Sequence, residues 1–161
     1  VEKSNKTPKI VLKLSELMRY MLYETKSKKQ TLENEILCIQ NYLDLERIRN
    51  DDRLEVNMYI SGDIHDKEIS PIILLTFIEN AFKYGVNPEL KSTIEIKIDL
   101  IENELIVFVS NKKVKKSNLV DDNHGIGIEN TKNRLILMYP NLHELKIEDA
   151  ENSYTVLLPA C

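Results

Sequence analysis

The sequence predicts a two-layer α/β sandwich with a mixed sheet, preceded by two N-terminal helices. Three observations lead to this prediction. Apolar residues recur at helical spacing over about the first fifty residues, alternating apolar runs follow from Arg53, and a strongly apolar helical stretch separates the first of these runs from the next. The predicted order is two helices and then β-α-β-β-loop-α-β-β.

Two helices are expected at the start of the chain. Residues 8–27 carry apolar side chains at helical spacing, namely Ile10, Leu14, Leu17 and Met21. After the charged break "KSKKQT", Thr31 is a suitable N-cap for a second helix that ends near "RNDD". Its predicted buried face consists of Leu32, Ile36, Ile39 and Leu43, with Leu37 and Leu45 alongside. Two helices joined by a short loop pack antiparallel, or dock on another layer or chain.

The sheet and its first covering helix are expected next. "RLEVNMYIS" alternates as a half-buried strand does and ends at the Ser61-Gly62 turn. Ser70 followed by Pro71 predicts a helix start, with serine as the cap and proline at the first helical position. That helix contains "LLTFIENAFKYG" and ends at Gly85. "TIEIKIDLI" and "LIVFVS" then predict a hairpin with "NE" as its turn.

The last part of the chain predicts a loop, a helix and two strands. Residues 112–123 are polar and have neither helical nor strand period, which predicts a loop of a dozen residues. "GIGIENTKNRLILMY" opens a helix with glycines, and Pro140-Asn141 ends it. "ELKIED" and "YTVLLPA" predict two strands joined by the turn "AENS".

Composition bounds the class of protein. With 161 residues, 42% hydrophobic and 30% charged, the chain suits one globular domain with a helical appendage. A net charge of −4 and the absence of Trp argue against nucleic acid as a partner. Cys38 sits among apolar helix positions, which predicts a buried thiol, and a reducing cytoplasm is the expected compartment. No signal peptide or membrane-spanning run is present, and the opening "VEKSNK" leads us to expect a fragment of a longer protein.

A polar stripe on the apolar helix is the first feature that could form a binding or catalytic site. Thr76, Glu79, Asn80 and Lys83 follow i, i+3, i+4, i+7 spacing, so they share one face. An amide oxygen and a carboxylate in a cleft suit Mg²⁺, a lysine one turn on suits a phosphate, and Glu79 is placed to orient or deprotonate a nucleophile. The alternative is an i,i+4 ion pair between Glu79 and Lys83 on a solvent-facing stripe.

The segment "HGIGIENTKNRL" is the second such feature. Gly125 and Gly127 directly precede a predicted helix, so backbone N–H groups and the positive end of the helix dipole can meet an anion. Asn130, Asn133 and Arg134 add donors in the first turns. The alternative is a pair of glycines that ends a loop, with Arg134 on a solvent-exposed helix face.

Together these motifs resemble the ATP-binding fold, also called the Bergerat or GHKL fold, shared by sensor histidine kinases, type II topoisomerases, mismatch-repair ATPases and a chaperone family. "PIILLTFIENAFKYG" is similar to the N box and "GIGIENTKNRL" to the second glycine box. More narrowly, "LSELMRYMLYET" and "QTLENEILCIQNYLDLERIRNDDRL" resemble the LytS-type branch of bacterial sensor histidine kinases.

The resemblance implies roles for matching residues only. Asn80 is the implied Mg²⁺ ligand, Glu79 the adjacent acidic residue that assists transfer, and Lys83 the phosphate-side lysine. The implied lid-closing phosphate loop and its donor pair are Gly125, Gly127, Asn130 and Arg134.

Two positions depart from the branch. Where it has Asp-x-Gly to accept a hydrogen bond from adenine, this chain has Ser110-Asn111-Lys112, which leaves Ser110 or Asn111 for that contact. Tyr84 stands where the branch often has His.

The resemblance also implies a function. Residues 1–50 would be a helical segment and residues 51–161 the ATP-binding catalytic domain of a histidine protein kinase. With ATP and Mg²⁺ it would transfer the γ-phosphoryl group to a histidine upstream of residue 1, and from there to a response regulator. The full-length protein would be a homodimer anchored in the cytoplasmic membrane, with this part in the cytoplasm.

Three alternatives to an active kinase remain open. The first is a degenerate module that relays conformation without catalysis. The others are an ATPase that works by dimer clamping, and a scaffold whose polar features are surface residues without a functional role. None of His65, His124 and His143 matches a phosphoacceptor.

Overall fold

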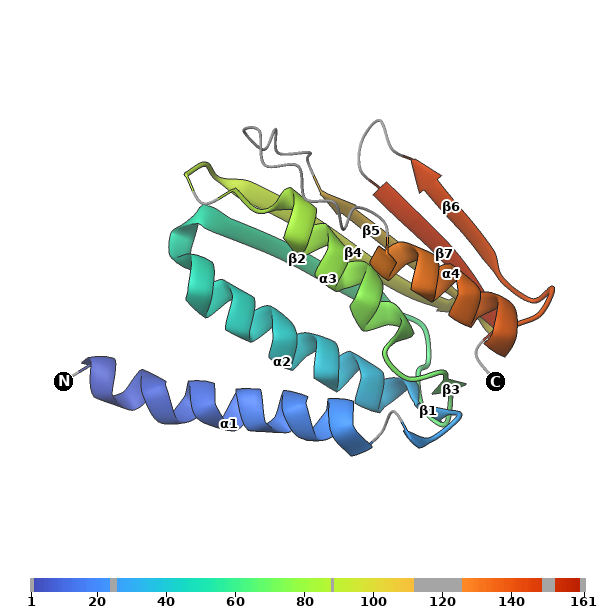
Figure 1. Ribbon diagram of the computed structural model, residues 1–161, viewed down its shortest axis with the longest axis horizontal. Helices are drawn as coiled ribbons and strands as arrows, with labels where there is room; N and C mark the ends of the chain where they lie inside the picture. The colour runs from blue at the N-terminus through green and yellow to red at the C-terminus, as the bar shows by residue number, and fades with distance from the viewer. Residues whose placement is uncertain (1, 24–25, 88, 112–125, 149–152, 160–161) are drawn as a thin grey trace.

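A five-stranded mixed sheet covered on one face by helices forms the body of the protein (Figure 1). The computed structural model describes residues 2–23, 26–87, 89–111, 126–148 and 153–159. The helices are α1 (Glu2–Tyr23), α2 (Leu32–Asn50), α3 (Ile73–Gly85) and α4 (Ile126–Met138), with a 3-10 turn, η2, over Asp51–Arg53. α2, α3 and α4 lie over the sheet, while α1 packs antiparallel on α2 at the edge of the molecule (Figure 1). The predicted fold class is confirmed.

The sheet has the order β2-β4-β5-β7-β6. Its strands are β2 (Leu54–Ser61), β4 (Ser92–Ile101), β5 (Glu104–Asn111), β6 (Glu144–Glu148) and β7 (Ser153–Pro159). β2 and β4 are parallel and the other neighbours are antiparallel. The parallel pair requires a crossover, and the chain between these two strands supplies it with α3.

The β4–β5 hairpin is confirmed, but its turn lies one residue earlier than predicted. Ile101 pairs with Glu104, so Glu102 and Asn103 form the turn. Glu102 has φ 57°, the left-handed conformation that tight hairpin turns require.

Two very short strands were absent from the prediction. β1 (Gln30–Thr31) pairs antiparallel with β3 (Glu68–Ile69), and the backbone N–H of Leu32 donates to the carbonyl of Lys67 at 2.7 Å. Two residues are too few to show a period. Their pairing depends on segments almost forty positions apart.

The predicted bounds of the first helix are wrong. α1 begins at Glu2 rather than residue 8, and its last residue is Tyr23 rather than residue 27. The prediction started where the apolar period starts, whereas helical hydrogen bonding continues through the polar residues before it. Pro8 lies inside α1, where its missing N–H removes one hydrogen bond without ending the helix.

The second helix follows its predicted bounds. Thr31 is the N-cap, and its hydroxyl oxygen accepts a hydrogen bond from the backbone N–H of Asn34 at 3.2 Å. The four residues of the predicted face are buried, whereas of the two alongside Leu45 is half-buried and Leu37 is 56% exposed. α2 shares one hydrophobic core with α3 and the sheet. The division of the chain at residue 50 stays a prediction.

The start of α3 also differs from its prediction. The helix begins at Ile73, not at Pro71, and Ser70 does not cap it. The backbone N–H of Ser70 instead donates to the hydroxyl of Tyr139, which follows α4, at 2.8 Å. The first turn of α3 is capped by Glu35 of α2, which accepts from the backbone N–H groups of Leu74 and Leu75.

Candidate functional site

The polar stripe of α3 lies on the surface of an otherwise buried helix. Glu79 and Lys83 are exposed, Thr76 is half-buried, and Asn80 is 8% exposed. Apolar neighbours such as Phe77 and Ile78 are fully buried. No ion pair joins Glu79 to Lys83 in the described part of the chain, where the ammonium of Lys83 instead lies 5.3 Å from the centre of the Tyr84 ring. The structure therefore does not contain the ion pair of the alternative interpretation.

A cavity of about 540 Å³ lies between α2 and α3, and two residues of the stripe, Glu79 and Lys83, line it, whereas Thr76 and Asn80 do not. The lining residues are Tyr42, Glu46, Arg49, Asn50, Glu79, Phe82, Lys83 and Val86. The ring of Tyr42 meets Phe82 edge to face, with centroids 5.4 Å apart. The cavity thus has an apolar floor and a rim that carries both signs of charge.

Three of the lining residues come from the last turns of α2, and sequence analysis had assigned no role to any of them. Arg49 lies 3.5 Å from Glu46 across one helical turn, and Asn50 donates to the carbonyl of Glu46 at 2.8 Å. The charged residues around "RNDD" were the available signal. This signal could not show that the C-terminal end of α2 faces α3.

Electrostatics at the cavity keep Tyr42 neutral. Burial raises the pKa of Tyr42, and the negative charges of Glu46 and Glu79 raise it further. The phenol is therefore a neutral hydrogen-bonding group on the cavity wall at physiological pH.

Asn80 is oriented by its own helix. Its side-chain Nδ2 donates to the carbonyl of Thr76 at 2.9 Å, and its Oδ1 accepts no hydrogen bond from the described residues. An amide oxygen held in this way fits Mg²⁺, which prefers oxygen ligands. Among the described residues no group of three or more His, Cys, Asp or Glu side chains is arranged to hold a metal.

The end of β5 lies against the end of α3. A Cβ placed on Gly85 would be 2.4 Å from the Cβ of Asn111, so only glycine fits there. Gly85 is required by this close approach rather than by a left-handed conformation. Asn111 is 3% exposed and adjoins the C-terminal end of α3, whereas Ser110 is half-buried and lies on the other face of β5.

The glycine segment is only partly described. α4 begins at Ile126, so Gly127 lies in its first turn rather than before it, which corrects the prediction. Glycine is tolerated there because the first N–H groups of a helix make no intrahelical hydrogen bonds. Gly125, His124 and the predicted loop of residues 112–123 lie outside the described residues.

α4 packs against α3 and presents the predicted donor pair at its surface. Thr131 and Leu135 are buried, Asn130 is exposed and Arg134 is half-buried. In the described part of the chain, neither Asn130 nor Arg134 forms a hydrogen bond or ion pair with the stripe of α3.

The described histidines sit outside the cavity. His65 lies 2.8 Å from the carboxylate of Glu33 in an exposed turn, and Nδ1 of His143 lies 2.7 Å from the carbonyl of Tyr139. Neither lines the space between α2 and α3.

Comparison with known proteins finds similarity to histidine kinases, the class that the sequence motifs resemble. Residues 1–54 match the family model described as histidine kinase. Over 160 residues the chain is 27% identical to the sensor protein kinase HptS of Staphylococcus aureus strain USA300, covering 92% of this chain and 30% of HptS.

Solved structures agree with this fold. The nucleotide-free catalytic domain of the histidine kinase ThkA superposes with a TM-score of 0.56 at 12% identity, over 81% of this chain and 93% of that one. Full-length ShkA, solved with AMPPNP, gives 0.59 at 14% identity over 99% of this chain and 37% of ShkA. ThkA in complex with the response regulator protein TrrA gives 0.52 at 11% identity, over 98% of this chain and 50% of that one.

The fold is therefore that of histidine kinase catalytic domains. By sequence, the chain is similar to sensor histidine kinases and spans about 30% of the length of the curated proteins that it matches. None of the described helices is long and apolar enough to cross a membrane.

Proposed function

We propose that this chain is the ATP-binding catalytic part of a LytS-type sensor histidine kinase. Residues 1–50 would be its helical segment and residues 51–161 its catalytic domain. It would transfer the γ-phosphoryl group of ATP to a histidine outside the chain. The observation that supports this most directly is the cavity between α2 and α3, on whose rim Glu79 and Lys83 lie while Asn80 is held beside them on the same helix.

The stripe provides the groups that such a transfer needs. Asn80 would hold Mg²⁺ through its side-chain oxygen, and Lys83 would place a positive charge beside the phosphates. Glu79, one residue from the metal ligand, would orient the attacking imidazole or accept its proton. When bound, Mg²⁺ neutralises charge on the phosphate oxygens, so that positioning and electrostatics account for most of the rate.

The two glycine-box regions would complete the nucleotide site. Backbone N–H groups in the first turn of α4, including that of Gly127, lie where a helix favours an anion. Gly125, Asn130 and Arg134 would add contacts to the phosphates. Ser110 or Asn111 would contact adenine in place of the carboxylate found in the branch.

The partner in phosphotransfer would be a response regulator, and nucleic acid is not expected. The structure of ThkA with TrrA is one such assembly in a protein of the same fold. We expect the full-length kinase to be anchored in the cytoplasmic membrane, with this part in the cytoplasm.

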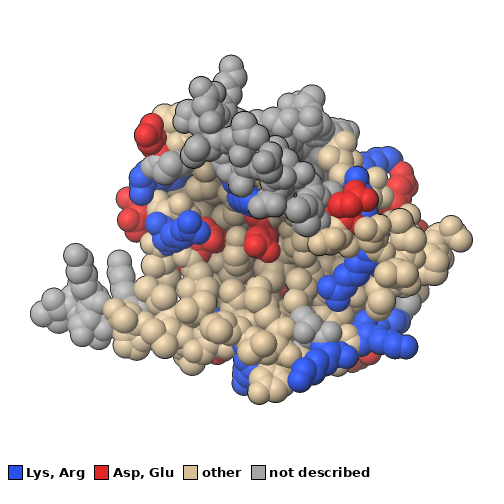
Figure 2. Space-filling model, in the orientation of Figure 1, with Lys and Arg blue, Asp and Glu red and all other residues tan. Residues whose placement is uncertain are grey.

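A homodimer through α1 is part of the proposal. α1 has two apolar faces, and the face with Leu17 packs on α2. The other face carries Val11, Leu14, Met18 and Met21, which are 39–56% exposed and follow the 3-4-3 spacing of a coiled-coil seam. Figure 2 shows the surface along α1 largely free of charge. A second copy of α1 is the partner that this spacing fits.

Titration with ATP·Mg²⁺ tests the nucleotide site. We expect saturable binding in calorimetry, weakened at least tenfold by Asn80→Ala. Asn57→Ala is the matched control, because Asn57 lies on β2 and its amide contacts only the exposed Glu55 among the described residues. Absence of binding at millimolar ATP, or equal binding by Asn80→Ala, would refute the proposal.

A degenerate kinase that relays conformation without transfer is the second candidate. The replacement of the adenine-binding carboxylate by Ser110-Asn111 favours it. Incubation of the full-length protein with γ-labelled ATP separates the two, because only the active kinase labels its own histidine.

A further inference from the structure

Glu35 of α2 is a carboxyl side chain in the centre of the protein; burial raises its pKa, and the hydrogen bonds that it accepts act in the opposite direction. It is fully buried, and its carboxylate accepts hydrogen bonds from three separate elements. The donors are the Tyr20 hydroxyl on α1, the Gln30 amide on β1, and the backbone N–H groups of Ile72, Leu74 and Leu75 at the start of α3. The three backbone distances are 2.9, 3.1 and 3.3 Å respectively.

The start of α3 depends on this carboxylate. No side chain of its own segment caps the helix, and the residue at the N-cap position, Ile72, has φ 64°. A β-branched residue in the left-handed region is strained and persists only when its surroundings hold it. The hydrogen bond from Ile72 N–H to Glu35, together with those from Leu74 and Leu75, provides that restraint.

Tyr20 brings α1 into the same cluster. Its hydroxyl donates directly to the oxygen of Glu35 that also accepts from Ile72. Burial and the negative charge of Glu35 raise the pKa of Tyr20, so the phenol remains a donor at every physiological pH. α1 and α3 therefore meet through a single carboxylate that belongs to α2.

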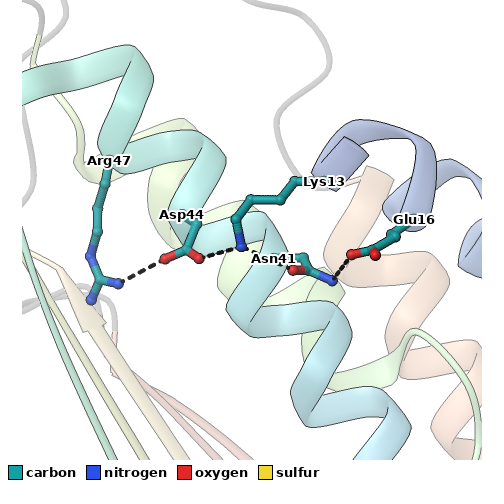
Figure 3. Close-up of polar contacts among 5 residues, drawn as sticks. All are labelled: Lys13, Glu16, Asn41, Asp44 and Arg47. Atoms are coloured by element: carbon teal, nitrogen blue, oxygen red, sulfur yellow. Dashed lines mark hydrogen bonds and ion pairs between the residues drawn. The ribbon is translucent and has the colours of Figure 1, made fainter. Parts of the chain in front are cut away.

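Other polar contacts between the described residues of α1 and α2 lie away from α3. Lys13 lies 2.6 Å from Asp44, and Glu16 accepts from Asn41 at 3.2 Å (Figure 3). Arg47 continues this network from Asp44 to the carbonyl of Val56 on β2. These contacts fix α1 on α2, whereas Tyr20 is the α1 residue whose hydrogen bond reaches the group that holds α3.

We propose that Glu35 is a positioning residue that sets the start of α3 according to where α1 lies, with Tyr20 as the contact from α1. This inference rests on the proposed function in taking α3 as the helix of the nucleotide site. Asn80 lies six residues beyond Leu74, about 9 Å along the same helix. A shift at the start of α3 therefore moves the metal ligand and the wall of the cavity.

Hydrogen exchange of single amides in the whole chain tests the coupling. In Tyr20→Phe we expect the amides of Ile72, Leu74 and Leu75 to exchange about tenfold faster, because a charge-assisted hydrogen bond that orients their acceptor is lost. Tyr23→Phe is the matched control on the same helix, since Tyr23 is exposed. Core amides of β4 report global unfolding and should be unchanged in both variants.

A second variant acts on the carboxylate itself. Glu35→Gln keeps the shape but replaces one acceptor oxygen by an amide donor that faces other donors, so the α3 amides should exchange faster still. Glu33→Gln removes an exposed carboxylate two residues away and is its control. Tyr20→Phe added to Glu35→Gln should then have little further effect, which a merely additive contribution to stability would not produce.

The outcomes separate this inference from the proposed function. Wild-type exchange at the α3 amides in Tyr20→Phe overturns the coupling, as does full additivity of the two substitutions. If these amides respond while the wild-type chain binds no ATP·Mg²⁺, the coupling stands and the proposed function fails. If the α3 amides respond in Tyr20→Phe and the wild-type chain binds ATP·Mg²⁺, the affinity for ATP·Mg²⁺ should fall in Tyr20→Phe and not in Tyr23→Phe.

Discussion

The two ends of α3 differ in how the protein surrounds them. At the first turn, Leu74 and Leu75 are buried and their N–H groups are bound by Glu35. Towards the other end, Glu79 and Lys83 are exposed and border a cavity of about 540 Å³. One helix is therefore held at its start by Glu35, while a single face of its later turns, with Glu79 and Lys83, is open to solvent.

This difference separates the residues that hold the helix from the residues that face a ligand. The buried start has its polar groups satisfied within the protein, so a substitution there changes stability. The exposed residues of the stripe, Glu79 and Lys83, make few contacts, so a substitution there leaves the fold intact and changes binding. The predictions below test this separation, from the largest expected effect to the smallest.

Removal of the Glu35 side chain should have the largest effect. Glu35→Ala leaves the buried N–H groups of Leu74 and Leu75, the part-buried N–H of Ile72, and the side chains of Tyr20 and Gln30 without their acceptor. We therefore expect a loss of about 3 kcal/mol or more in the free energy of unfolding. Urea unfolding followed by circular dichroism measures it. Glu33→Ala should change stability by less than about 0.5 kcal/mol. Similar losses in both variants would show that the cluster has no special role.

The reactivity of Cys38 reports whether the face of α2 that carries Glu35 is shielded from solvent. Burial, with a smaller contribution from the charge of Glu35, raises the pKa of the Cys38 thiol to about 12. At pH 8 its thiolate fraction is then about 10⁻⁴, against about 10⁻¹ for a thiol at the ordinary value of 9.0. In a Cys161→Ser background we expect Cys38 to react with a disulfide reagent about 1,000-fold more slowly than in urea. Its rate should rise about tenfold per pH unit up to pH 11, and a plateau below pH 10 would contradict the closed arrangement.

Gly85→Ala tests the contact between the end of α3 and β5. The added methyl group would lie 2.4 Å from the Cβ of Asn111, so the helix end or the strand must shift. We expect a loss of about 1–3 kcal/mol in the free energy of unfolding. Thermal unfolding of Gly85→Ala beside wild type measures it, and an unchanged or raised midpoint would show that the two elements are not packed this closely.

Lys83→Ala should have the smallest effect on the fold. The side chain is exposed, so stability should stay within about 0.5 kcal/mol of wild type. Affinity for ATP·Mg²⁺ should fall about tenfold if the ammonium neutralises phosphate charge, which corresponds to about 1.4 kcal/mol. Lys97→Ala, on the strand face opposite the buried Ile96 and Ile98, is the control in calorimetry. Equal affinities in both variants would remove Lys83 from the nucleotide site.

The sequence by itself determined the fold class and most of the elements. Alternation predicted β2, β4 and β5, because a strand with one buried face must repeat every second residue. Thr31 was identified as a cap because capping is decided within four residues. The stripe of Thr76, Glu79, Asn80 and Lys83 followed from helical spacing alone.

Only the tertiary structure decided how these parts meet. Glu35 could have been noticed as a charged residue in the buried stripe of α2, but its partners lie up to 40 residues away. The start of α3 was mispredicted for the same reason, since the group that caps it belongs to another helix. The end of α2 at the cavity and the contact of Gly85 with Asn111 likewise depend on packing between distant segments. Periodicity and caps are local properties that a sequence displays directly, whereas these contacts exist only once the layers are assembled.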